Sequence, residues 1–230
     1  MALTDDNEEK RKLLSSALIG AALVSALWIV KAAESLFNTS FVTFGILPLK
    51  AEGLIGIVTA PLVHGSIEHL ISNSIPFFLL TAALFYYYRP KARQILIILW
   101  LVTGFWLWLF ARGRAYHIGA SGVVYALASF HFISGVIRRE PRLAAFSLLV
   151  TFLYGSFVWG IFPGFALKER ISWEGHLMGG IAGFVLAFFY KDVGPQKHRY
   201  WEEEDDDDDD ENEDSQPPFT YFYKEENNLE

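Results

Sequence analysis

Two short runs contain a serine and a histidine that can do nucleophilic chemistry together. Ser121 lies in the run Gly-Ala-Ser-Gly, flanked by Gly119 and Gly122, and His176 follows the run Trp-Glu-Gly. A serine hydroxyl becomes a nucleophile when a nearby imidazole removes its proton, and uncharged donors then stabilise the developing oxyanion. If the fold brings Ser121 and His176 together, these residues predict hydrolysis.

A third run, HGSIEHLISN, supplies such donors. His69 and Asn73 are four residues apart and share one face of a helix, and His64 lies further out. The backbone N–H of Ser121 is another donor, because the first N–H groups of a helix lack intrahelical partners. The His64–His69 spacing differs from the i, i+4 pair of zinc metalloenzymes, and we expect neither a metal nor another cofactor. Helix capping and interhelical hydrogen bonds also explain this run when it is taken alone.

Glycines beside His176 and Ser121 predict close packing between helices. Gly175, Gly179 and Gly183 recur every four residues and predict a helix that packs closely on another, which would bring the neighbouring histidine toward a partner side chain. Taken alone, Gly-Ala-Ser-Gly is also explained by helix packing. Tyr125 lies four residues after the serine and shares its helix face.

The elements that must position these residues are too apolar for a water-soluble protein. Hydrophobic residues make up 52% of the chain, and six stretches carry no charged residue: 13–30, 70–88, 94–111, 115–137, 143–167 and 175–190. A hydrocarbon core about 30 Å thick needs about 20 helical residues. We therefore predict an all-α polytopic membrane protein with six transmembrane helices. None of the six stretches contains Asp, which argues against a Ser-His-Asp triad.

The distribution of Lys and Arg predicts the orientation of these helices. The segments on the side shared by both termini hold twelve of these residues, and the loops on the opposite side hold six. Positively charged segments stay in the cytoplasm, so both termini are predicted to be cytoplasmic. With this orientation, the three runs lie at the starts of the second, fourth and sixth helices. All three starts are on the outer side and at a similar depth in the membrane. The first loop, 32–63, is apolar but broken by Gly and Pro, and we expect it in the outer membrane interface.

Charge divides the chain further. Residues 201–230 hold 15 acidic groups and one Lys and carry −14, whereas residues 1–200 hold 18 Lys and Arg against 11 Asp and Glu, a net of +7. We predict a cytoplasmic N-terminal segment over 1–12, a six-helix domain over 13–192 and a disordered acidic cytoplasmic tail over 193–230, whose partner the sequence does not name. The charge excludes a basic nucleic-acid binder, and the absence of Cys excludes thiol catalysis.

The three runs together resemble the motifs of the rhomboid family of intramembrane serine proteases. HGSIEHLISN, GASGVVYAL and GHLMGGIAG look like the family's HxxxxHxxxN, GxSG and His-GxxxG motifs, in the same order over about 13–190. The resemblance implies a compact six-helix form like that of the bacterial members, in the inner membrane of a bacterium. It also implies an endopeptidase that cleaves single-span membrane proteins near the outer face of the lipid bilayer.

The resemblance implies a role for each residue of the motifs. Ser121 matches the nucleophile and His176 the general base of a dyad, with His69, Asn73 and the backbone N–H of Ser121 as the oxyanion hole. Four further positions match residues that orient the base or shape the site: Tyr125, Gly119, Gly122 and His64. Many members also carry a Trp-Arg pair in the first loop, but residues 32–63 contain no Trp.

Two other functions stay open at this point. An inactive rhomboid-like protein would bind membrane clients without cutting them, although such relatives typically lack the serine or the histidine, and this chain has both. A six-span transporter would show internal repeats and polar residues at mid-membrane. The polar residues here cluster instead at one predicted edge. For His117, just before the GxSG run, a place at the mouth of the site is the minor interpretation, and a role outside the site is favoured.

Overall fold

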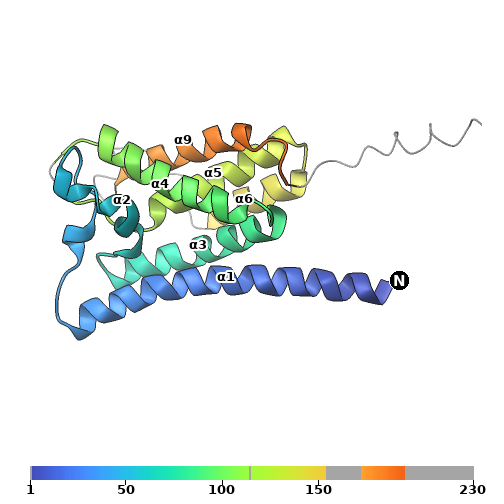
Figure 1. Cartoon of the computed structure of the whole chain (residues 1–230), viewed down its shortest axis with the longest axis horizontal. Coiled ribbons are helices and arrows are strands. Elements are labelled where there is room, and N and C mark those ends of the chain that lie inside the picture. The colour runs from blue at the N-terminus through green and yellow to red at the C-terminus, as the bar shows by residue number, and fades with distance from the viewer. Residues whose placement is uncertain (1, 114, 154–171, 195–230) are drawn as a thin grey trace, which may run out of the picture. The chain divides into compact units, whose positions relative to one another are not determined.

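The computed structural model describes residues 2–113, 115–153 and 172–194, which belong to one compact unit. Within these residues the structure is helical and has no strand (Figure 1). Residues 154–167 of the fifth predicted stretch lie outside the described residues, and so does the predicted acidic tail apart from its first two positions.

Six apolar helices overlap the six predicted stretches. Three are long and apolar enough to cross a membrane: α1 (Ala2–Leu36), α3 (Ile67–Tyr87) and α4 (Ala92–Phe110). Three are shorter, as far as the structure describes them: α5 (Ser121–Ile137), α6 (Pro141–Leu153) and α9 (Trp173–Phe189). A membrane span for these three stays a prediction.

The first helix is longer than its uncharged stretch. α1 extends through the charged N-terminal residues, where Lys12 Nζ lies 3.4 Å from Glu9 Oε1 one turn away. The hydroxyl of Tyr86, near the end of α3, donates to Glu9 Oε2 at 2.6 Å. Charges therefore end the apolar stretch but not the helix, because they pair along α1 and with α3.

The first loop folds into a series of short helical turns. Its helical pieces are η1 (Val42–Phe44), η2 (Ala51–Gly53), α2 (Gly56–Thr59) and η3 (Ala60–Leu62). Indoles of α4 hold the loop: Trp108 Nε1 donates to Lys50 O and Trp100 Nε1 donates to Val58 O, both at 3.0 Å. Tryptophans outside the loop thus anchor a segment that has none of its own.

α9 lies along α5 at the distance that glycine permits (Figure 1). A Cβ added to Gly179 would lie 2.0 Å from the carbonyl oxygen of Gly122, and a Cβ on Gly183 would lie 2.1 Å from that of Ala126. The two backbones are therefore in direct contact, as the small-residue spacing predicts. Gly175 differs, since its added Cβ would face Ser172 and Leu107 of α4.

An arginine joins the C-terminal ends of α3, α5 and α9. Arg138, directly after α5, is 5% exposed. Its guanidinium donates to Tyr88 Oη at 2.8 Å, to the carbonyl of Lys191 at 3.1 Å, and to the carbonyls of Tyr190 and Val193. It satisfies acceptors that the end of α9 leaves without intrahelical partners.

Candidate active site

The structure brings Ser121 and His176 together. Ser121 is the first residue of α5 and His176 is the fourth residue of α9, and Ser121 Oγ lies 2.9 Å from His176 Nε2. The histidine is only 4% exposed. This geometry lets the imidazole accept the hydroxyl proton in the step that activates a serine.

An aromatic ring holds the imidazole in place. Tyr125 lies one turn after Ser121 on α5, and its ring stacks on that of His176 with centroids 4.1 Å apart and planes 14° apart. Such stacking favours one ring orientation.

Local sequence starts α9 at the right place. Ser172 is its N-cap, and Ser172 Oγ accepts a hydrogen bond from the N–H of Gly175 at 3.2 Å. Glu174 in the first turn is favourable beside the positive end of the helix dipole. This serine was absent from the sequence prediction, although Ser before an acidic first turn is a typical helix start.

His69 lies against the backbone that leads into α5. Gly119 has φ +107°, a conformation that favours glycine. A Cβ there would also lie 2.7 Å from Cε1 and 2.9 Å from Nε2 of His69. The imidazole of His69 therefore packs against Gly119, two residues before Ser121.

The two other predicted donors are Asn73 and the backbone N–H of Ser121, and they differ in their hydrogen bonds. Asn73 is 3% exposed, and its Nδ2 donates to the carbonyl of His69 at 2.8 Å, which uses one of its two N–H bonds. The backbone N–H of Ser121 is at a helix start, where the helix supplies no acceptor. Among the described residues, neither the second N–H of Asn73 nor the backbone N–H of Ser121 donates to an acceptor.

His64 links the first loop to the start of α5. Its Nε2 accepts from the N–H of Ala120 at 3.3 Å, and its ring contacts that of His69 edge-on at 5.1 Å. Burial, with repulsion from His69, lowers the pKa of His64 to about 4, so the ring is neutral at pH 7. The backbone carbonyl of His64 accepts a hydrogen bond from Lys31 Nζ. Lys31 Nζ also lies 2.8 Å from Oε2 of the buried Glu34.

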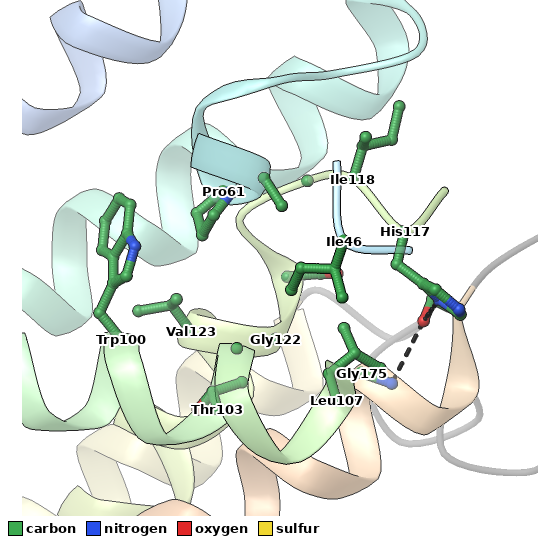
Figure 2. A pocket seen from close by; sticks show the side chains of 15 residues that line it. Ile46, Pro61, Trp100, Thr103, Leu107, His117, Ile118, Gly122, Val123 and Gly175 are labelled. Carbon is green, nitrogen blue, oxygen red and sulfur yellow. Dashed lines mark hydrogen bonds between the residues drawn. The ribbon is translucent and has the colours of Figure 1, made fainter. Parts of the chain in front are cut away.

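A small cavity opens beside the serine (Figure 2). Its volume is about 30 Å³, and it lies between the first loop, α4 and the starts of α5 and α9. Ser121 lines it together with His117 and Thr103, and neither Nε2 of His117 nor Oγ1 of Thr103 has a hydrogen-bond partner in the described structure.

The structure adds Thr103 to the predicted set and places His117 at the site. Thr103 has no signal in the sequence, because it is one hydroxyl within the apolar helix α4. Among the described residues, no group of three or more His, Asp or Glu is arranged to hold a metal ion.

Comparison with known proteins identifies the family. Residues 51–192, or 142 of the 230, match the Rhomboid domain family. A Mycobacterium tuberculosis protein whose name states no function is 32% identical over 170 residues, which cover 72% of this chain and 71% of that protein. A Mycobacterium leprae protein is 28% identical over 191 residues, covering 80% and 75%. A protein of Acanthamoeba polyphaga mimivirus, provisionally named a rhomboid protein, is 27% identical over 131 residues, covering 55% and 70%.

The family match and the apolar helices both indicate that the site belongs to a membrane protein. The matched segment contains both residues of the Ser121–His176 pair, the ring that stacks on the histidine and the glycines that hold the two helices together. The chain belongs to the rhomboid family of integral membrane proteins.

Proposed function

We propose that this protein is an intramembrane serine endopeptidase with Ser121 as nucleophile and His176 as general base. The 2.9 Å contact between their side chains is the observation that carries the proposal. Ser121 Oγ attacks the scissile carbonyl carbon as its proton passes to His176 Nε2. The tetrahedral intermediate then collapses as the same nitrogen returns the proton to the leaving amine. Water hydrolyses the resulting acyl ester by the reverse use of the same groups.

The oxyanion of this intermediate needs donors that are already in place. We assign this role to the backbone N–H of Ser121, the remaining N–H of Asn73 and the imidazole of His69. All three lie at the end of the helices where α3, α5 and α9 begin. Tyr125 takes the orienting role that an aspartate has in a triad, because its ring fixes the plane of His176.

The position of the site at the helix ends supports a substrate class. Single-span membrane proteins would be cleaved near the outer face, with the inner membrane of a bacterium as the site of action and both termini of the protease in the cytoplasm. A helical peptide bond is protected by its own hydrogen bonds, so the substrate must unwind locally before Ser121 reaches it.

Labelling by a fluorophosphonate tests the activated serine. Membranes containing the full chain are treated with the probe, and we expect Ser121→Ala to abolish labelling and His176→Ala to slow it about 100-fold. Ser134→Ala is the matched control, because this serine lies in the same helix and is buried away from the pair. Failure of the folded wild type to label would favour an inactive protein that binds membrane clients. Cleavage of a co-expressed single-span reporter then tests the peptidase step.

A further inference from the structure

A second serine–histidine contact lies beside the proposed dyad. His117 Nδ1 lies 2.6 Å from Ser172 Oγ. This contact joins the segment before α5 to Ser172, the N-cap residue of α9. The backbone of His117 is fixed as well: its N–H donates to Ile46 O at 2.8 Å and its carbonyl accepts from Ile46 N at 2.9 Å. The imidazole is therefore held both by its backbone and by one of its ring nitrogens.

The hydrogen bonds of Ser172 indicate which ring nitrogen carries the proton. Ser172 Oγ accepts from the N–H of Gly175, the bond drawn as a dashed line at Gly175 in Figure 2. The hydroxyl hydrogen of Ser172 can then be donated to another group. Donation to His117 Nδ1 uses that hydrogen and leaves the ring proton on Nε2. The opposite tautomer would leave the serine hydrogen without this acceptor. The contacts thus favour a neutral imidazole with an N–H at Nε2.

That N–H has no partner within the described structure. His117 lines the same cavity as Ser121, and its Nε2 is buried. A buried donor without an acceptor costs about 1–3 kcal/mol, so such a group is usually satisfied by a ligand or water. The cavity volume of about 30 Å³ exceeds what one water molecule needs.

We propose that His117 is a substrate-binding residue whose Nε2–H donates to a backbone carbonyl of the substrate next to the scissile bond, and that Ser172 fixes the tautomer required. The inference rests on the proposed peptidase function. An unwound substrate presents carbonyl oxygens that have lost their helical partners, and a carbonyl oxygen fits both the chemistry of the donor and the size of the cavity. Thr103 Oγ1 lines the same cavity and offers a second hydroxyl to its occupant.

Two phosphonate probes separate substrate binding from activation of the serine. An alkyl fluorophosphonate reports on the dyad and its oxyanion donors, whereas a peptidyl phosphonate also presents backbone carbonyls. For His117→Phe and Ser172→Ala, we expect the inactivation rate constant for the peptidyl probe, divided by that for the alkyl probe, to fall about tenfold. The double variant should fall no further than His117→Phe, because Ser172 acts through the histidine.

Conservative variants control for folding. Ser172→Thr keeps both the hydroxyl and the helix cap, and His117→Gln keeps an uncharged donor, so each should retain the ratio within about threefold. Thermal unfolding in detergent checks that the loss of the Ser172 cap, worth about 1 kcal/mol, does not by itself explain the result.

Each other outcome overturns the inference in a distinct way. If both probes slow equally in His117→Phe, the residue only supports the dyad. If the probe ratio is unchanged while reporter cleavage falls, the cavity holds the hydrolytic water instead of a substrate carbonyl. If neither probe labels the wild type while it is folded, the proposed peptidase function fails, and the inference fails with it.

Discussion

Gly179 of α9 faces the carbonyl oxygen of Gly122 of α5 so closely that a Cβ on Gly179 would lie 2.0 Å from it. Gly122 follows Ser121 directly, and Gly179 lies one turn after His176. This backbone contact therefore sets the distance between the two side chains of the proposed dyad. The oxygen belongs to the backbone, so no side-chain rotation relieves the clash that a larger residue would make.

Gly179→Ala tests this relationship. The added methyl must push α9 from α5, which we expect to cost about 1–3 kcal/mol of stability and, through misplacement of His176, to slow fluorophosphonate labelling about 100-fold. Thermal unfolding in detergent and the labelling rate give the two values. The adjacent Gly180→Ala is the matched control, because a Cβ there meets no atom within 4 Å. Equal labelling by the two variants would show that this contact does not position the dyad.

The stacking of Tyr125 on His176 leads to a second prediction. Tyr125→Phe keeps the ring, so labelling should stay within about fivefold of the wild type, whereas Tyr125→Ala frees the imidazole and should slow labelling at least tenfold. The second-order rate constant for labelling is measured for each variant under the same conditions. Similar rates for the Phe and Ala variants would remove the ring from the mechanism.

Sequence reasoning and structure agree where a contact follows from spacing within a helix. The four-residue repeat of glycines in α9 predicted its close packing, and the shared face of Ser121 and Tyr125 is the face that meets His176. The extent of α1 was less predictable, because its charged first turns are held by pairing with another helix.

Contacts between distant segments were the hardest to foresee. The Ser172 hydroxyl meets His117 across 55 residues, and no local pattern links a loop histidine to the cap of a helix that begins so much later. The indole of Trp108 likewise reaches Lys50 across 58 residues. Such pairs depend on how the helices pack, and this packing is not encoded in the spacing of either segment alone.

The arginine at the far end of the bundle should affect stability more than reactivity. Arg138→Lys loses the forked donor that serves Tyr88 and the last carbonyls of α9, and we expect a loss of about 2 kcal/mol. Arg139→Lys is the control, because Arg139 is exposed. Unfolding temperatures in detergent measure the loss. At 20 °C, fluorophosphonate labelling of both variants should match the wild type, and a selective loss in Arg138→Lys would mean that the far end also positions the dyad.

The buried His64 makes stability depend on pH in a definite direction. Burial, with repulsion from His69, lowers its pKa from the usual 6.5 to about 4. Between these two values the unfolded chain binds a proton that the folded protein does not, so the free energy of unfolding falls as the pH falls from about 6.5 to 4. At pH 5 the loss from this residue alone is about 2 kcal/mol relative to pH 7.5.

His64→Gln removes this titration but leaves the other histidines in place. The unfolding temperature of each protein is measured in detergent at pH 7.5 and pH 5. The variant starts lower, because the acceptor for Ala120 is altered, but its drop between the two pH values should be smaller than that of the wild type by several degrees. Equal drops would show that His64 gains its proton as easily in the folded protein as in the unfolded chain. The ring would then not be the neutral acceptor that its contact with Ala120 requires.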